Sequence, residues 1–523
     1  MHEFGFNALI FHQNDLMDQI VLPREYFSEE MMWEYWPIRL CAIGTNGEYI
    51  RKVIREAKKR GIDFFLQVKE IWYPEELLER FPELRTKEGY ICATDPFWFQ
   101  FLELKTKELL EDFPDIGGII VSPATRESKV SIAANRCECE RCRATEQKDW
   151  YTGYLKALYR PLEKAGKTLI VRDFSYTVGA QNAVIAAVEE CSKDIVIGLK
   201  NTPHDFWPVF PDNVRIGTSN GLREYIEFDV VGQYCGLGVF PCSLVEDLKK
   251  RLDYCRDKGS TGLWCRTDWE LLDEVSTFNS FNQLNLIAAG MLSRDPSCDL
   301  DSVYKAWTNY GLFSSLREES RTGEPVRPTS KQAVEKLKNF MIASWSVIEK
   351  TLYVRGHVFQ YSSRFQHAIR SIYNIMMKYH QREQWEPGSS ANVAPTAENI
   401  DVILGEKEQA KAEVRKLSSI LEVDSLGLPR EFADEITDML DLYTYYVDGF
   451  AHMAKAYFMT QKSSSSGDEQ DITSAKLARD ELAEFSRKLR ARLENTSYPF
   501  YVYWLMDYKE LDMLVEDIDH LLK

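Results

Sequence analysis

Short apolar runs recur along the first 312 residues, separated by longer amphipathic stretches, and this recurrence most constrains the fold. The runs are continuously apolar rather than alternating, which is typical of parallel strands buried on both faces. Strand-like runs that alternate with helical stretches indicate repeated β–α units. The predicted strands are Phe6–Phe11, Ile38–Ile43, Phe64–Val68, Ile116–Val121, Leu169–Arg172, Ile195–Leu199, Ile226–Val231 and Gly262–Cys265.

Eight strands separated by helices is the number found in a TIM barrel, so residues 1–312 are predicted to form an α/β domain of the (β/α)8 type. A doubly wound open sheet is the alternative. The clearest helical stretches between the runs are Glu48–Arg60, Phe99–Phe113, Trp150–Ala165 and Leu244–Lys258.

The pattern changes in the second half of the chain. From Ser330 onward no convincing strand pattern occurs, and helical periodicity dominates, as in Ile436, Leu440, Tyr443 and Val447. Loops are expected at 386–390 and at the serine run 463–467. Residues 313–523 are therefore predicted to form an all-α C-terminal domain, whose aromatic stripe from Tyr443 to Phe458 serves as core or as a dimer contact.

Composition excludes several classes of protein. Of the 523 residues, 44% are apolar and 28% charged, as in an ordinary globular chain. The net charge of −17 argues against a nucleic-acid-binding surface. No run is long enough to span a membrane, and the first residues lack the basic start of a signal peptide. With only 11 cysteines, the chain is expected in a reducing cytoplasm.

Function in a TIM barrel gathers at the C-terminal ends of the strands. Carboxylates, cations and aromatic rings follow most of the predicted strands. They include His12, Lys69, Glu70, Glu127, Arg172, Lys200, Asp205, Glu227, Asp229 and Arg266, together with Trp72, Tyr73, Tyr176, Trp207, Trp264 and Trp269. Carboxylate pairs serve glycoside hydrolysis, and cations suit an anionic substrate, although any single charged residue here can equally be a solvated or salt-bridged one.

Several segments together resemble one family of enzymes. They are Gly5–Asp15, Ala93–Pro96, Ile116–Val121, Ile170–Tyr176, Ile197–Phe206, Gly232-Gln233 and Gln283–Pro296. The most specific is the Lys-Asn-x-Pro-x-Asp-Phe sequence that begins at Lys200. In order and spacing this set resembles the barrel of the α-glucuronidases of glycoside hydrolase family 67, or a related glycosidase family, from about Phe4 to about Trp307.

The resemblance implies an inverting, exo-acting glycoside hydrolase that removes a terminal uronic acid of the α-glucuronic type, with a role in xylan degradation and carbohydrate metabolism. Asp205 and Asp229 match the base-side carboxylates, and Glu127 is the matching candidate for the general acid. Arg172 and Lys200 match cations that hold the sugar carboxylate. Inversion requires the acid and base carboxyl groups to lie roughly 6.5–9.5 Å apart, which leaves room for the attacking water.

Four further residues are predicted to contact substrate: His12, Trp72, Tyr176 and Trp269. An oligosaccharide is the expected partner, and the helical domain is a candidate homodimer contact. Two alternatives remain open. A barrel glycosidase acting on a neutral or amino sugar would hold Arg172 and Lys200 in internal salt bridges, and a catalytically dead carbohydrate-binding barrel would not bring the carboxylates together.

The cysteines form one local motif. Cys137, Cys139 and Cys142 make a CxCxxC sequence whose thiolates suit zinc. A structural zinc, free thiols in a loop and redox chemistry all remain open. A closed zinc site needs a fourth ligand, for which Cys235, Cys242, Cys265 or a histidine are the candidates. No cofactor is expected for catalysis, because no HExxH, phosphate-loop or dinucleotide-binding sequence occurs.

Overall fold

The structure, a computed structural model, describes residues 1–523 except 176, 269–271, 273–274 and 313–325. The chain divides into two compact units. Unit 1 comprises residues 1–200, 214–227 and 255–264, and unit 2 comprises residues 201–213, 228–254 and 265–523. The predicted domain boundary at residue 312 borders residues outside the described part and stays a prediction.

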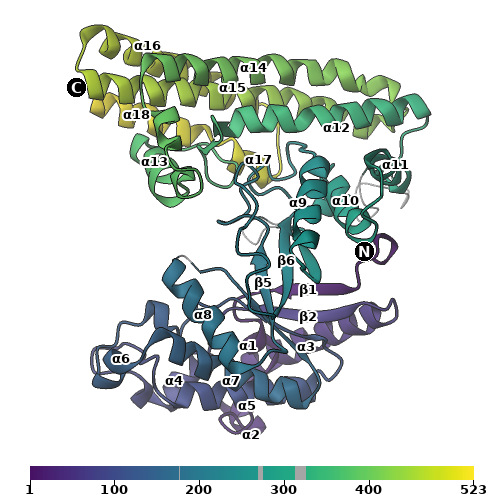
Figure 1. The fold of residues 1–523 in the computed structure, drawn as a ribbon, viewed down its shortest axis with the longest axis vertical. Coiled ribbons are helices and arrows are strands. Elements are labelled where there is room, and N and C mark those ends of the chain that lie inside the picture. The colour runs from purple at the N-terminus through teal and green to yellow at the C-terminus, as the bar shows by residue number, and fades with distance from the viewer. Residues whose placement is uncertain (176, 269–271, 273–274, 313–325) are drawn as a thin grey trace. The chain divides into compact units, whose positions relative to one another are not determined.

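Seven strands form one sheet in chain order, and they curl into a half-barrel (Figure 1). The strand pairs from β1 to β6 are parallel. The strands are β1 (Ala8–His12), β2 (Asp63–Val68), β3 (Gly118–Val121), β4 (Thr168–Arg172), β5 (Val196–Lys200), β6 (Arg223–Asp229) and β7 (Gly262–Arg266). Seven of the eight predicted strands are thus confirmed, and the fold is a barrel-like α/β fold rather than a complete eightfold TIM barrel.

The predicted strand Ile38–Ile43 is wrong, because these residues form the first turns of helix α3 (Pro37–Lys58). Pro37 occupies the first helical turn, where its fixed φ favours a helix and its missing N–H costs nothing. Ile38 is 85% exposed, which is incompatible with a buried strand. A short apolar run does not by itself distinguish a strand from part of a helix.

Helices cover the strands of unit 1. Helix α3 packs on β2 and α7 packs on β4. The helices are α1 (Leu16–Ile20), α2 (Glu29–Tyr35), α3, α4 (Glu76–Arg80), α5 (Phe97–Asp112), α6 (Glu140–Ala144), α7 (Gln147–Lys164) and α8 (Val178–Cys191), and α9 (Val245–Asp257) passes from unit 2 into unit 1. The predicted stretches that begin at Glu48, Phe99, Trp150 and Leu244 are confirmed as parts of α3, α5, α7 and α9.

The interior of the half-barrel follows from the two-residue period of its strands. Ile120, Ile170, Val196 and Trp264 form a buried cluster, against which Ile10, Phe65 and Tyr225 pack. Side chains two or four residues further along the same strands lie on the same face. This places Ser122, Arg172, Lys200 and Glu227 above the apolar layer, at the C-terminal ends of β3 to β6.

Gly198 on β5 makes room for the largest side chain of that layer. A Cβ atom built at Gly198 would lie 2.3 Å from the ring of Trp264. The indole therefore fills the space that a larger residue on β5 would need, directly beneath the level of Lys200.

Unit 2 is dominated by long helices, of which α12, α14, α15 and α16 lie side by side (Figure 1). Its helices are α10 (Gln283–Arg294), α11 (Leu300–Tyr310), α12 (Lys331–Leu352), α13 (Ile369–Asn374), α14 (Ala397–Leu421), α15 (Arg430–Ser466), α16 (Glu469–Glu494), α17 (Phe500–Leu505) and α18 (Tyr508–Leu521). The aromatic stripe of α15 is core, since Tyr443, Tyr446 and Phe450 are fully buried and Tyr446 stacks on Phe240.

Two details of unit 2 differ from the sequence prediction. The serines of the predicted loop 463–467 continue α15, and the helix ends only at Gly467, whose positive φ closes it. A two-stranded hairpin, β8 (Tyr353–Val354) and β9 (His357–Val358), stands where no strand was expected. Its strands are two residues long, too short for an alternating pattern, and its turn residues Arg355 and Gly356 both have positive φ.

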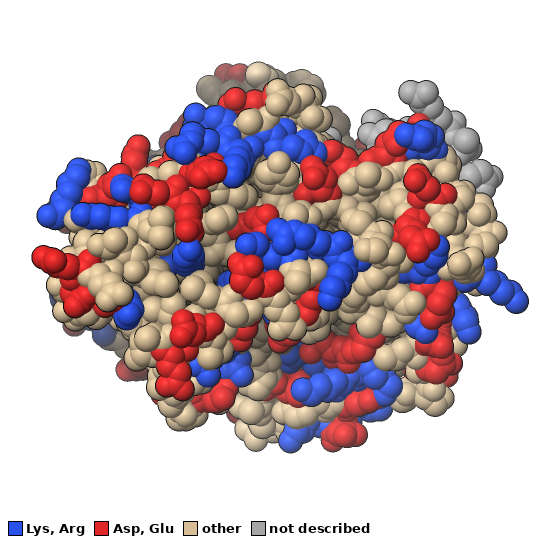
Figure 2. Space-filling view, turned by 90° about the horizontal axis from the view of Figure 1, so that it is seen from above, with Lys and Arg blue, Asp and Glu red and all other residues tan. Residues whose placement is uncertain are grey.

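Charges are mixed over the surface. Figure 2 shows basic and acidic side chains interspersed over the face in view. Within the described residues, none of the helices combines the length and the apolar character that crossing a membrane requires.

Replacing Gly198 by alanine tests the packing of the half-barrel. The added methyl group has to displace the Trp264 ring, so the free energy of unfolding is expected to fall by about 1–3 kcal/mol. Gly44→Ala on α3 is the matched control, because a Cβ atom there meets no heavy atom within 4 Å. The control is expected to be neutral or to stabilise by up to about 1 kcal/mol. Urea unfolding of both variants checks this, and equal midpoints would contradict it.

Candidate active site

Three cations of unit 1 surround one aromatic ring at the C-terminal ends of β2, β4 and β5. The Nζ atom of Lys200 lies 3.8 Å from the ring centroid of Phe174, that of Lys69 lies 4.7 Å away, and the guanidinium carbon of Arg172 lies 4.5 Å away. All three cationic side chains are buried. The electron-rich face of a phenyl ring stabilises cations, and this effect grows when they are shielded from water.

Arg172 is also held by a carboxylate. Its Nε donates to Oε2 of Glu227 at 2.6 Å, and its Nη2 donates to Oε1 at 2.9 Å. Glu227 lies on β6, and both residues are at least 95% buried. The bidentate geometry is the strong form of an arginine–carboxylate pair. Much of the charge of Arg172 is therefore compensated inside unit 1.

The predicted acid, Glu127, lies in the loop after β3 and its side chain is 40% exposed. Its Oε2 lies 2.7 Å from Nζ of the buried Lys69. The structure thus connects Glu127 to the cations around Phe174 through Lys69.

Glu70 organises the loop that carries Glu127. Oε1 of Glu70 accepts a hydrogen bond from the backbone N–H of Ala124 at 3.0 Å. Its own N–H donates to Oγ of Ser128 at 2.9 Å. Burial raises the pKa of Glu70 to about 7, although hydrogen bonds from Ser131, Ala124 and Ser128 lower it. The loop passes through positive φ at Ala124 and Arg126, so it needs such a fixed anchor.

In unit 2, Asp205 is held by Tyr234. The phenol donates a short hydrogen bond to Oδ2 of Asp205. Burial, followed by the negative charge of Asp205, raises the pKa of Tyr234 well above its ordinary value, so the phenol keeps its proton and remains a donor. Asp205 itself has φ of 51°, a left-handed conformation in which aspartate is enriched. The hydroxyl of Thr202 holds this turn by donating to the carbonyl of Asp205.

Asp229 ends β6 and belongs to a second polar group of unit 2. Its Oδ2 accepts a hydrogen bond from the backbone N–H of Gln233 at 2.7 Å. The side chain of Gln233 accepts from Nη1 of Arg266 at 2.6 Å and donates to Oγ of Ser362 at 3.1 Å. Asp229, Gln233 and Ser362 are all buried. A buried hydrogen-bond network holds the Asp229 side chain more firmly than solvent holds an exposed carboxylate.

Two histidines lie beside the Asp205 turn. Nε2 of His204 and Nδ1 of His380 are 2.9 Å apart, and the His380 ring also packs 4.8 Å from that of Trp207. Trp207 stacks on Tyr234 with a centroid separation of 3.7 Å. The phenol that holds Asp205 is therefore itself positioned by an aromatic stack.

The remaining residues predicted to contact substrate are His12, Trp72, Tyr176 and Trp269. His12 lies exposed at the end of β1. Nζ of Lys129 lies 5.6 Å from the ring centroid of Trp72, and the role of Trp72 as a substrate contact stays a prediction. Tyr176 and Trp269 lie outside the described residues.

Four cysteines of unit 1 could hold a metal. Cys92, Cys137, Cys139 and Cys142 place their Sγ atoms within 4.8 Å of one another. The fourth member is Cys92, not Cys235, Cys242, Cys265 or a histidine as the sequence suggested. Cys92 precedes α5 and is separated from the CxCxxC motif by more than 40 residues, so the sequence spacing gave no signal for it.

No family model matches the chain, and no curated protein sequence matches it. One solved structure shares the fold over nearly the whole chain: a protein described as a GH138 enzyme targeting pectin rhamnogalacturonan II. It aligns with a TM-score of 0.60 and 14% sequence identity, over 93% of this chain and 56% of that protein. The chain thus spans a little over half the length of this structural neighbour.

Dispersin B also aligns, with a TM-score of 0.28 and 10% identity, over 56% of this chain and 90% of that protein. The likeness to the GH138 enzyme confirms a barrel-like α/β fold combined with a large helical part. Membership of family 67 stays a prediction from sequence.

Sequence reasoning missed several residues of these polar groups. Phe174 and Tyr234 are not ionic, and only their neighbours Arg172 and Asp205 carried a motif. His380 comes from the helical half of the chain, where no site was expected. Glu227 and Lys69 could be recognised in the sequence as charged residues near strand ends. Their ion-pair partners, Arg172 and Glu127, could be identified only from the three-dimensional structure.

The raised pKa of Glu70 predicts a pH-dependent stability. Because its folded-state pKa of about 7 exceeds the ordinary value of 4.5, the carboxyl group stabilises the fold fully below about pH 4.5. This contribution is lost as the pH rises through 7. Between pH 5 and pH 8 the free energy of unfolding is expected to fall by about 2–3 kcal/mol more in the wild type than in Glu70→Gln.

Denaturant unfolding at both pH values measures this difference. Glu70→Gln keeps the acceptor for Ala124 but cannot titrate, and Glu103→Gln, an exposed residue of α5, is the matched control. The same pH dependence in Glu70→Gln and the wild type would contradict the assignment.

Proposed function

We propose that this chain is a glycoside hydrolase that acts on an oligosaccharide carrying a terminal uronic acid. The observation that carries the proposal is the group of Lys69, Arg172 and Lys200 around Phe174. Three buried cations gathered around one ring at the ends of the strands suit a substrate that carries a negative charge. A sugar carboxylate supplies such an anion.

The structural neighbour supports the reaction class. It is described as a GH138 enzyme targeting pectin rhamnogalacturonan II. The choice of a uronic acid rests on the resemblance to α-glucuronidases found in the sequence. The α-glucuronic linkage of xylan side chains is the specific candidate from that resemblance.

Asp205 is the proposed general base. A base that activates water must be ionised, and the hydrogen bond from Tyr234 favours the carboxylate form. The turn that presents Asp205 is fixed by Thr202 and by its left-handed backbone, which keeps the carboxylate in one orientation. Asp229 is the proposed second carboxylate on the base side, oriented by the backbone of Gln233.

Glu127 is the proposed general acid, and its contact with Lys69 sets a condition. A general acid must hold a proton when the leaving oxygen departs. In the structure Glu127 is instead paired with the ammonium group of Lys69. The proposal therefore requires Lys69 to turn from Glu127 toward the substrate carboxylate, so that binding of a uronate releases Glu127 for protonation.

A neutral or amino sugar is the second candidate, and the ion pair of Arg172 with Glu227 favours it. That alternative expects the cations to be engaged by internal carboxylates, as Arg172 is. Lys200 lies closest to the Phe174 ring of the three cations. Replacing Lys200 leaves the ion pair of Arg172 with Glu227 in place. A Lys200 variant therefore distinguishes recognition of a uronate from recognition of a neutral or amino sugar better than an Arg172 variant does.

The wider setting remains part of the proposal. A cytoplasmic enzyme would act on short imported oligosaccharides. The helical part of unit 2 is the proposed contact of a homodimer, and no cofactor is required for the hydrolytic step.

Asp205→Asn tests the assignment of the base. Loss of a general base is expected to lower kcat by about 10²–10⁴-fold with little change in KM. Tyr234→Phe should lower kcat less, because it removes only the donor that orients the carboxylate. Release of free sugar from glucuronic and galacturonic oligosaccharides measures both effects. Asp149→Asn, an exposed aspartate of α7, is the control, and full activity of Asp205→Asn would move the base to another residue.

Lys200→Met tests the recognition of a uronate. Methionine keeps an unbranched chain against Phe174 but removes the charge. The ratio kcat/KM is expected to fall by about 10–100-fold on a uronoside and to change little on the corresponding neutral glycoside. Paired glucuronosides and glucosides, and paired galacturonosides and galactosides, provide the comparison. Preference of the wild type for the neutral member of each pair would support the second candidate instead.

A further inference from the structure

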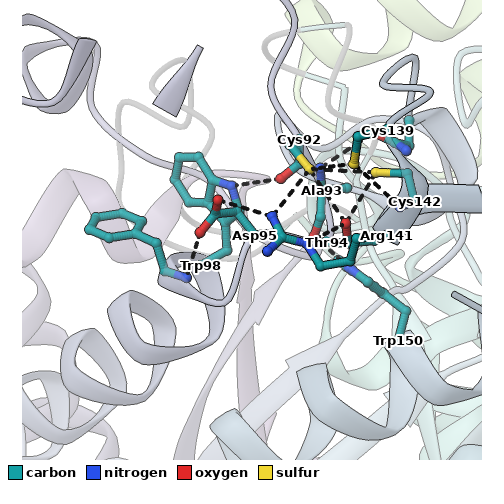
Figure 3. Close-up of polar contacts among 11 residues, drawn as sticks. Cys92, Ala93, Thr94, Asp95, Trp98, Cys139, Arg141, Cys142 and Trp150 are labelled. Carbon is teal, nitrogen blue, oxygen red and sulfur yellow. Dashed lines mark hydrogen bonds and ion pairs between the residues drawn. The ribbon is translucent and has the colours of Figure 1, made fainter. Parts of the chain in front are cut away.

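We propose that Cys92, Cys137, Cys139 and Cys142 bind one structural Zn²⁺ ion in unit 1. Their four Sγ atoms lie within 4.8 Å of one another. Of the three cysteines labelled in Figure 3, Cys92 has its Sγ 3.4 Å from that of Cys142 and 3.9 Å from that of Cys139. A tetrahedral site with Zn–S distances of about 2.3 Å places its sulfur atoms about 3.8 Å apart. The four cysteines are thus arranged around a volume of the right size.

The backbone around the cysteines has the hydrogen bonds that such a site needs. The N–H of Cys142 donates to Sγ of Cys139 at 3.4 Å, so this sulfur already has a backbone donor. The side chain of Asn135 accepts from the N–H groups of Ala93 and Cys137 and donates to the carbonyl of Cys137. One asparagine therefore fixes the two chain segments that supply the ligands.

Further contacts hold Cys92 in place. The indole N–H of Trp98 donates to the carbonyl of Cys92 at 3.1 Å, and that of Trp150 donates to the carbonyl of Ala93 at 2.7 Å (Figure 3). Arg141 directs Nη2 at Sγ of Cys92 at 3.8 Å and pairs with Asp95 at 3.2 Å. Four thiolates around Zn²⁺ carry a net charge of about −2, which the guanidinium of Arg141 partly compensates.

A closed set of four thiolates fixes the role of the ion. Catalytic zinc keeps one position for water or substrate, whereas four cysteines fill the tetrahedron. Zinc is therefore a structural clamp that joins residues 92–95, ahead of α5, to residues 137–142, in the connection between β3 and α7. That connection also contains Glu127 and its anchoring contacts to Glu70.

The chain purified under reducing conditions is expected to contain about one equivalent of zinc. Metal analysis measures it directly. After removal of the metal, addition of Co²⁺ should give the visible absorption of tetrahedral cobalt together with a sulfur-to-metal charge-transfer band. Cys139→Ser and Cys142→Ser should each lower the zinc content by at least about tenfold, while Cys41→Ser, an exposed cysteine of α3, should retain the full equivalent.

Hydrogen exchange provides a readout that does not depend on a folded variant. Removal of zinc from the wild type by a chelator should speed exchange at residues 92–95 and 135–144 and leave helices α14 to α16 unchanged. Addition of Zn²⁺ should restore slow exchange.

Three results would overturn the proposal. They are purification with less than about a tenth of an equivalent of zinc together with failure to bind added Zn²⁺, recovery of iron in place of zinc, and pairing of these cysteines as disulfides under reducing conditions. None of these measurements uses hydrolysis, so the zinc site and the proposed glycosidase activity can fail independently.

Discussion

The buried ion pair between Arg172 and Glu227 is the interaction on which the polar layer of unit 1 depends. Both groups stand directly above the apolar layer of Ile120, Ile170 and Val196, where an uncompensated charge would be very costly. Removing one partner of such a pair costs about 3–5 kcal/mol, because the other charge remains buried. With Arg172 compensated, its guanidinium repels its cationic neighbours around Phe174 less than a bare charge would.

Charge then connects the fold to the proposed substrate. Cations gathered in a barrel interior attract an anion, and the low dielectric there strengthens that attraction relative to water. The exchange proposed for Lys69 uses the same attraction, since a uronate that engages Lys69 frees Glu127 from its partner. A neutral sugar would leave Glu127 paired with Lys69, and the same residues would then serve a neutral glycoside poorly.

Strands and helices that depend on local periodicity could be predicted from the sequence. Contacts between residues far apart in the chain could not. Buried parallel strands are continuously apolar, so β1 to β7 were predicted, whereas Ile38–Ile43 has a similar composition and forms a helix after Pro37. Arg172, Lys200 and Asp205 were predicted as site residues because they end or follow strands. Their partners Glu227, Phe174 and Tyr234 depend on register and on loop paths that no local pattern encodes. Cys92 was missed for the same reason.

The connection between β3 and α7 contains little regular secondary structure, which explains why a metal clamp would stabilise it. Residues 122–146 contain only two short helical segments, η3 (Ile132–Ala134) and α6, so few backbone hydrogen bonds of regular structure hold them. A segment of this kind opens easily unless side chains or a metal fix it. Glu70 anchors its beginning near Ala124, and the four cysteines lie near its end. Glu127 lies between Ala124 and Ser128, both of which bond to Glu70, so the acid that must exchange partners with Lys69 is carried on a loop that is held on both sides of it.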